Sequence, residues 1–101
     1  MAQVPKTVTV GFRNQTNMDL LVQGYTIVNG VQRLGQPVMI RRGSIAFELN
    51  VPAGIRFYTI ADAKAPLRPL LSREPVTIQP RDSSFMISSP NDPKRIVLLP
   101  D

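Results

Sequence analysis

Few side chains in this sequence could carry out acid–base or nucleophilic chemistry. The chain holds seven carboxylates but no histidine and no cysteine, so neither a Ser–His–Asp nor a Cys–His arrangement can form. A Ser–Lys pair would need a lysine in or beside a terminus or a proline-rich loop, where the ammonium group stays solvated. Four carboxylates lie near turns, where we expect them to accept hydrogen bonds from backbone amides: Asp62, Glu74, Asp82 and Asp92. The sequence therefore predicts a protein that is not an enzyme and has no catalytic residues.

Metal and phosphate sites lack their usual ligands as well. Zinc is bound by Cys and His side chains, which the chain does not have. Calcium needs clustered carboxylates and carbonyls, and the sequence contains no such loop. It also contains no glycine-rich phosphate-binding motif. We expect no metal and no cofactor.

Positive charge is the remaining chemical signal. Nine arginines and three lysines give a net charge of +5, and arginine suits bidentate binding of phosphates and carboxylates. The arginines are scattered, and Arg41-Arg42 is the one adjacent pair. Single-strand binders combine such charges with exposed aromatic rings, for which Tyr58 beside Arg56, and Tyr25, are the candidates. Binding of a polyanion or single-stranded nucleic acid is accordingly the alternative function.

Residues 43–62 form the central stretch of the predicted fold. We expect two strands joined by the tight turn Val51-Pro52-Ala53-Gly54, because Pro52 presets a type I corner and Gly54 tolerates a left-handed backbone. Burial of each large apolar side chain on one face would stabilise the fold by roughly 1.5–3 kcal/mol. That predicted core face carries Ile45, Phe47, Leu49, Val51, Ile55 and Phe57.

The other face of this predicted hairpin is the candidate interaction surface. Tyr and Arg are favoured as anchors of protein interfaces. Glu48 would lie diagonal to Arg56, within reach of an exposed ion pair worth under about 1 kcal/mol. Together with the two arginines of the preceding turn, the candidate residues are Arg41, Arg42, Glu48, Arg56, Tyr58 and Ile60.

A second hairpin has the stronger turn signal. Asn29-Gly30 favours a type I′ turn, which would pair Val28 with Val31 and continue to Tyr25 with Leu34. The next pair is Gly24 with Gly35, which leaves a bare spot on the sheet. We interpret that spot as a bend or bulge, or else as a place where a ligand or another backbone approaches closely.

Ten prolines and six glycines interrupt the chain, and no segment keeps helical spacing over three turns. About seven to nine short strands with alternating apolar residues predict an all-β domain. We expect one domain over residues 1–101, an antiparallel β-sandwich with Greek-key connections; a small β-barrel is the alternative. Besides the two hairpins, the predicted strands cover residues 7–13, 38–40, 76–79, 83–88 and 96–99, and residues 67–71 form a loop or edge strand.

The strand Val8-Thr9-Val10-Gly11-Phe12 and the Val51–Gly54 turn give the chain a general likeness to known sandwiches. In architecture it resembles immunoglobulin-like and cupredoxin-like domains. The Cys–Trp–Cys signature of antibody domains and the ligands of copper sites are both absent. The resemblance implies a fold and no activity.

These observations predict a non-catalytic structural or protein-binding module. Its partner would be another protein or a second copy, joined through an edge strand. The apolar edge candidates are residues 38–40 and 96–99. No run of apolar residues is long enough to span a membrane, and no signal peptide is visible. The sequence does not determine the cellular compartment; export from a bacterial cell is the location that we considered.

Overall fold

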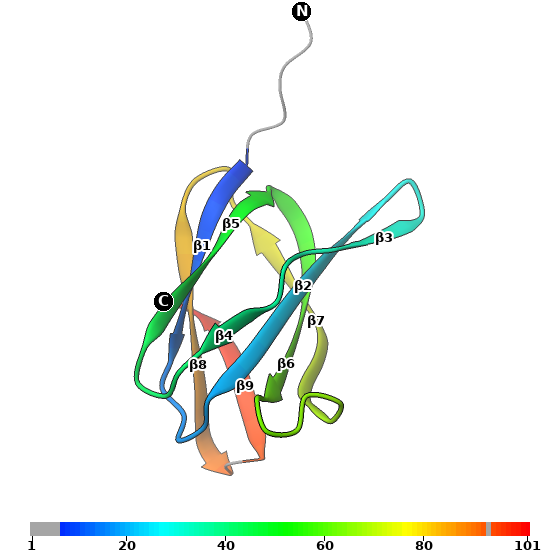
Figure 1. Cartoon of the computed structure of the whole chain (residues 1–101). Coiled ribbons are helices and arrows are strands. Elements are labelled where there is room, and N and C mark those ends of the chain that lie inside the picture. The colour runs from blue at the N-terminus through cyan, green and yellow to red at the C-terminus, as the bar shows by residue number, and fades with distance from the viewer. Residues whose placement is uncertain (1–6, 93) are drawn as a thin grey trace, which may run out of the picture.

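The computed structural model describes residues 7–92 and 94–101, and within them every regular element is a β-strand (Figure 1). The strands are short and are separated by turns rich in proline, glycine and asparagine, as the composition predicted. Their bounds are β1 Thr7–Asn14, β2 Leu20–Val28, β3 Val31–Leu34, β4 Val38–Ile40, β5 Ile45–Pro52, β6 Gly54–Asp62, β7 Pro69–Ile78, β8 Ser83–Asp92 and β9 Arg95–Pro100. No helix in the described residues could cross a membrane.

The strands form two sheets that pack face to face. One sheet has the order β5-β1-β8-β9, and the other has the order β3-β2-β6-β7 with β4 also paired to β2. Both sheets are open at their edges, so the fold is a β-sandwich and the alternative of a closed barrel is excluded. The prediction of the fold class is confirmed, with one difference. β1 and β8 run parallel, whereas we expected only antiparallel neighbours.

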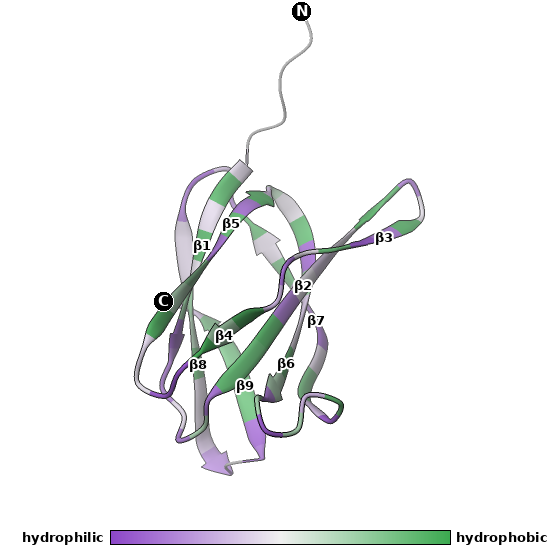
Figure 2. Ribbon diagram, viewed as in Figure 1, coloured by the Kyte–Doolittle hydropathy of each residue, from purple (hydrophilic) through white to green (hydrophobic). Residues whose placement is uncertain are grey.

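The core lies between the sheets and comes from the alternating faces of their strands (Figure 2). In β1, Val8, Val10 and Phe12 point inward and are buried, as their spacing predicted. Phe12 packs edge-on against Tyr58 and is stacked with Phe85, with ring centroids 5.1 and 6.2 Å away. The remaining core residues are Leu20, Val22, Ile40, Val51, Ile60, Ile78, Ile87 and Ile96.

The β2–β3 hairpin has the predicted register. Val28 pairs with Val31, and the ladder continues to Tyr25 with Leu34. Asn29 and Gly30 both have positive φ angles, 52° and 77°, as a type I′ turn requires. The tip of this hairpin extends beyond the rest of the sandwich in Figure 1.

The predicted hairpin over residues 43–62 is wrong. β5 pairs with β1 in one sheet, while β6 pairs with β2 and β7 in the other. The chain between them therefore crosses from sheet to sheet instead of reversing within one. Asn50 and Gly54 have φ angles of 57° and 119°, which bend the backbone on both sides of Pro52 and allow this crossing.

The predicted faces of these two strands are also inverted. Glu48, Arg56 and Tyr58 point into the sandwich, whereas Phe47 and Leu49 are 55% and 66% exposed. Of the six residues predicted as core, Val51 is buried, Phe57 is half-buried on the outer side of its sheet, and Ile45, Phe47, Leu49 and Ile55 are exposed.

Candidate functional site

The six residues of the predicted interaction surface do not share a surface. Arg41 and Arg42 are exposed in the turn between β4 and β5. The other four are buried, which corrects the prediction that they face solvent: Glu48, Arg56, Tyr58 and Ile60 are 5%, 4%, 0% and 0% exposed. The physical reason is that the two strands belong to opposing sheets, so the face predicted to be outside is the one on which the sheets meet.

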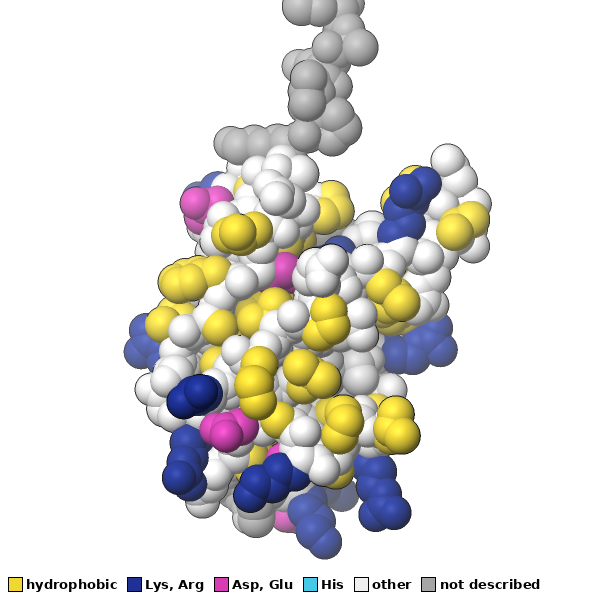
Figure 3. All heavy atoms as spheres, in the orientation of Figure 1, with side chains coloured by type: hydrophobic (Ala, Val, Ile, Leu, Met, Phe, Trp, Pro, Cys, Tyr) yellow, Lys and Arg dark blue, Asp and Glu magenta, His cyan; other side chains and the backbone are white. Residues whose placement is uncertain are grey.

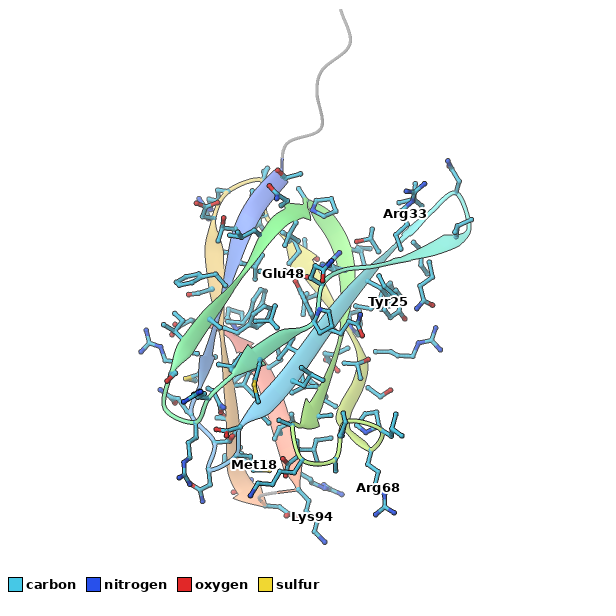
Figure 4. The ribbon with its side chains drawn as sticks, in the orientation of Figure 1. Met18, Tyr25, Arg33, Glu48, Arg68 and Lys94 are labelled. Atoms are coloured by element: carbon cyan, nitrogen blue, oxygen red, sulfur yellow. The ribbon has the colours of Figure 1, made fainter. Side chains whose placement is uncertain are left out.

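Glu48, Arg56 and Tyr58 form a polar network between the sheets. Glu48 extends from β5 and accepts a hydrogen bond from Arg56 Nη2 at 2.7 Å on one oxygen, and from the Tyr58 hydroxyl at 2.6 Å on the other. Arg56 Nη1 donates to Thr26 Oγ1 at 2.6 Å. Figure 4 shows Glu48 in the interior, between β5 and β2. The carboxylate thus joins one sheet to the other.

This network is suited to structure rather than to proton transfer. Burial, together with the hydrogen bond to Glu48, raises the pKa of Tyr58 well above its ordinary value of 10.0. A phenol of that kind keeps its proton at neutral pH and cannot act as a base. The Arg56 side chain also lies against the Tyr58 ring, with Cζ 5.6 Å from the ring centroid.

The paired glycines make room for this network. A Cβ atom on Gly24 would lie 2.6 Å from both Arg56 Nε and Tyr58 Cε1, and one on Gly35 would lie 2.8 Å from Glu48 Oε2. The bare spot predicted at this pair is real, but its occupant is the protein's own guanidinium. The predicted pairing of the two glycines marked this spot in the sequence, but the residues that fill it, Glu48 and Arg56, come from β5 and β6.

The carboxylates at turns behave as predicted where the structure describes their bonds. Asp62 and Asp92 accept hydrogen bonds from the amides of Lys64 and Lys94, two residues ahead, and Asp82 accepts one from Thr9. Among the described residues, no three His, Cys, Asp or Glu side chains are placed to hold a metal ion.

The exposed surface of β5 is the feature that the sequence prediction missed. Ile45, Phe47 and Leu49 are 46%, 55% and 66% exposed on its outer face. The Phe47 ring lies over Gly11 of β1, so a Cβ atom there would approach Phe47 Cε1 to 3.2 Å. Farther along the same sheet, Leu99 is 44% exposed. A row of large apolar side chains in water is characteristic of a surface that binds a partner.

β5 also has a free backbone edge. It pairs with β1 on one side, and among the described residues no strand pairs with its other side. Beyond that edge lies a groove of ≈ 500 Å³. Its far wall is the segment that contains β4, and Glu48 and Arg56 lie at its base. Figure 3 shows hydrophobic side chains across this side of the molecule. The groove is lined by Gly35, Gln36, Pro37, Val38, Met39, Phe47, Glu48, Leu49, Asn50 and Arg56.

The two predicted edge segments are edges in the structure. Residues 38–40 form β4 and residues 96–99 belong to β9; within residues 7–92 and 94–101, β4 pairs only with β2 and β9 only with β8. β4 is three residues long, and β9 lies beside the edge of β7 in the other sheet. β5, with eight residues, is the longer free edge beside the groove.

A comparison of the chain with protein-family models and with curated proteins found no match.

Proposed function

We propose that this chain is a non-catalytic structural module that assembles through β5, with β5 of a second copy as its strand partner. The observation that carries the proposal is the coincidence, on one strand, of a free backbone edge and an exposed apolar face. Main-chain hydrogen bonds supply affinity when a strand is added to an edge, and the alternating side chains supply specificity.

The sequence of β5 supports pairing with itself. In an antiparallel pair centred on Phe47, the two Phe47 rings would face each other and Ile45 would face Leu49 of the second copy. Cross-strand apolar pairs of this kind stabilise a sheet by roughly 0.2–1 kcal/mol each. The antiparallel arrangement would also separate the arginine pairs, since Arg41 and Arg42 precede β5 at one end only. Such a two-fold interface is closed and stops at a dimer.

Edge strands of monomers are commonly protected by proline or by outward charge. Between Ile45 and Leu49, β5 contains no proline, and its single charge, Glu48, is already neutralised by Arg56. A strand added at this edge would therefore not have to desolvate an unpaired carboxylate. The bend at Asn50 limits the pairing segment to residues 45–49.

Sedimentation velocity over a range of protein concentrations tests the proposal. The wild type is expected to shift from monomer to dimer as concentration rises. Phe47→Glu is expected to stay monomeric, because it places two carboxylates opposite each other. Ile55→Glu is the matched control: Ile55 is 63% exposed on β6, so this variant should dimerise like the wild type. A wild type that remains monomeric at high concentration would rule out self-assembly through β5.

The alternative function, binding of a polyanion or single-stranded nucleic acid, has weaker support. Its two candidate rings are unavailable for base stacking, because Tyr58 and Tyr25 are 0% and 5% exposed. Tyr25 is covered by Phe57, whose ring stacks on it at 5.0 Å, and its hydroxyl accepts a hydrogen bond from Arg73 at 2.8 Å.

A further inference from the structure

One end of the sandwich collects half of the chain's cations. β4 and β6 both run antiparallel to β2, so they end on the same side of the molecule. β8 runs parallel to β1, whose last residue, Asn14, bonds with Gly43 and Ser44 of the turn after β4. Figure 4 shows Arg68 and Lys94 at this end. The six exposed cations of this cationic end are Arg41, Arg42, Lys64, Arg68, Lys94 and Arg95.

Three carboxylates share this end, and all three are directed at loop backbone. Asp19 accepts a hydrogen bond from the amide of Arg42 at 3.0 Å, and Asp62 and Asp92 accept from the amides of Lys64 and Lys94 at 2.9 Å. In the part of the chain that the structure describes, none of the six cations lies within 4.0 Å of a carboxylate oxygen as an ion pair. The guanidinium and ammonium groups therefore extend into solvent with an excess of positive charge.

A large apolar side chain extends from the same end. Leu67, in the loop between β6 and β7, is 93% exposed, the highest value among the exposed large apolar residues. Two backbone hydrogen bonds fix this loop, from Ala65 to the carbonyl of Asp62 at 2.8 Å and from Arg68 to that of Ala65 at 3.0 Å. Leu67 is held outward by these turns, between Lys64 and Arg68 in sequence.

We infer that this cationic end binds the surface of an anionic lipid membrane. The cations would contact headgroup phosphates, and Leu67 would enter the boundary of the acyl chains. Stable peripheral binding needs two signals, and a basic cluster with an inserted apolar group provides both. A nucleic acid fits less well, because the loops of this end contain no aromatic residue on which a base could stack, and an exposed leucine contributes nothing to phosphate binding. This surface is separate from β5.

Sedimentation with lipid vesicles tests the inference. The wild type is expected to bind vesicles of phosphatidylcholine mixed with phosphatidylserine, and not vesicles of phosphatidylcholine alone. Each cation near such a surface changes the partition coefficient about fivefold. Arg41→Gln/Arg42→Gln should therefore lower it about 25-fold. Arg33→Gln/Arg81→Gln makes the same change in net charge at residues outside the cationic end, and should have a much smaller effect.

Leu67→Ser distinguishes a membrane from other polyanions. Loss of the inserted side chain is expected to weaken vesicle binding about tenfold, and to leave binding to heparin or to an oligonucleotide unchanged. Leu34→Ser, at another exposed leucine outside this end, is the matched control and should bind vesicles like the wild type. If Leu67→Ser binds vesicles as well as the wild type does, or if the wild type binds an oligonucleotide more tightly than vesicles, the inference is overturned.

Discussion

Glu48 and Arg56 form a buried ion pair that connects the two sheets of the sandwich. Their side chains are each 5% exposed, and 2.7 Å separates Glu48 Oε2 from Arg56 Nη2. The ion pair expected from the sequence is therefore present, but its surroundings differ from those expected. A pair on the surface contributes little to stability, whereas a buried pair makes each partner dependent on the other.

Glu48→Gln tests that dependence. The substitution leaves a buried guanidinium without a counter-charge, and breaking a buried pair in this way costs about 3–5 kcal/mol. Chemical denaturation should show that loss in the free energy of unfolding. The control is Glu48→Leu/Arg56→Met, which removes both charges and fills the space with apolar atoms. The double variant should be more stable than Glu48→Gln; if it is equally unstable, the charge of Arg56 is not the cause.

Gly24→Ala tests whether the glycine pair exists to admit Arg56. The new methyl group would collide with Arg56 Nε and with the Tyr58 ring, which lie within the core. Overpacking of this kind costs about 1–3 kcal/mol. Gly11→Ala is the control, since its nearest neighbours are 3.2 Å away and one is the half-exposed ring of Phe47, which can move outward. When Arg56 is also replaced by Met, Gly24→Ala should lower the free energy of unfolding by less than it does in the wild type. An equal loss in both backgrounds would show that Gly24 is not required to make room for Arg56.

The sequence was sufficient to predict those features that depend only on residues close together in the chain. Asn29-Gly30 fixes its own turn through two positive φ angles, so the β2–β3 register follows from the turn alone. β1 could be predicted equally well, because Val8, Val10 and Phe12 alternate with polar or small residues, and all three face the core. The parallel pairing of β1 with β8 has no local signal, since the two strands lie far apart in the sequence.

The orientation of the strands in residues 43–62 could not be predicted, because each strand carries apolar residues on both of its faces and either face could have pointed into the core. The face of β5 with more large apolar residues carries Phe47 and Leu49, so it was predicted to be buried and Glu48 to be exposed. The structure reverses this, since Arg56 supplies the counter-charge for Glu48 and two distant glycines supply the space for Arg56. That arrangement depends on residues from three strands, β2, β5 and β6, and from the connection between β3 and β4. The same reversal moved the candidate interaction surface from Tyr58 and Ile60 to the exposed face of β5.

Alkaline pH is expected to destabilise the fold through Tyr58. Burial and the hydrogen bond to Glu48 raise the pKa of this phenol in the folded state. Above about pH 10 the unfolded chain releases the Tyr58 proton while the folded chain retains it. The contribution of Tyr58 to stability is therefore fully present below that pH and declines above it, by up to about 1.4 kcal/mol per pH unit.

Tyr58→Phe provides the comparison for this pH dependence. At neutral pH the variant should be less stable by about 1–3 kcal/mol, because Glu48 Oε1 loses its buried donor. Above about pH 10 the difference between the two proteins should shrink, since the Tyr58 phenol is present only in the wild type, whereas Tyr25 is common to both. Denaturation curves at neutral and alkaline pH measure both effects. A difference that stays constant across this range would contradict the assignment to Tyr58.

Asn14 is expected to hold together the loops that carry the cationic end. Its side chain is buried, donates from Nδ2 to the carbonyls of Met18 and Ile40 at 2.7 and 3.0 Å, and accepts on Oδ1 from Thr16. Asn14→Asp keeps the shape and the acceptor but replaces the donor with an oxygen that faces two carbonyls.

The buried Ile40 carbonyl would lose this donor, at a cost of about 1–3 kcal/mol. The part-buried Met18 carbonyl would lose it too, but the Thr16 hydroxyl lies 3.2 Å away and can still donate to it. Denaturation should show this loss at neutral pH for Asn14→Asp, and part of it should be recovered in acid, where a protonated carboxyl can donate to one carbonyl. Asn17→Asp, at an exposed position of the same loop, should unfold like the wild type. Equal stability of Asn14→Asp and the wild type would show that the loops at this end are fixed by their backbone hydrogen bonds alone.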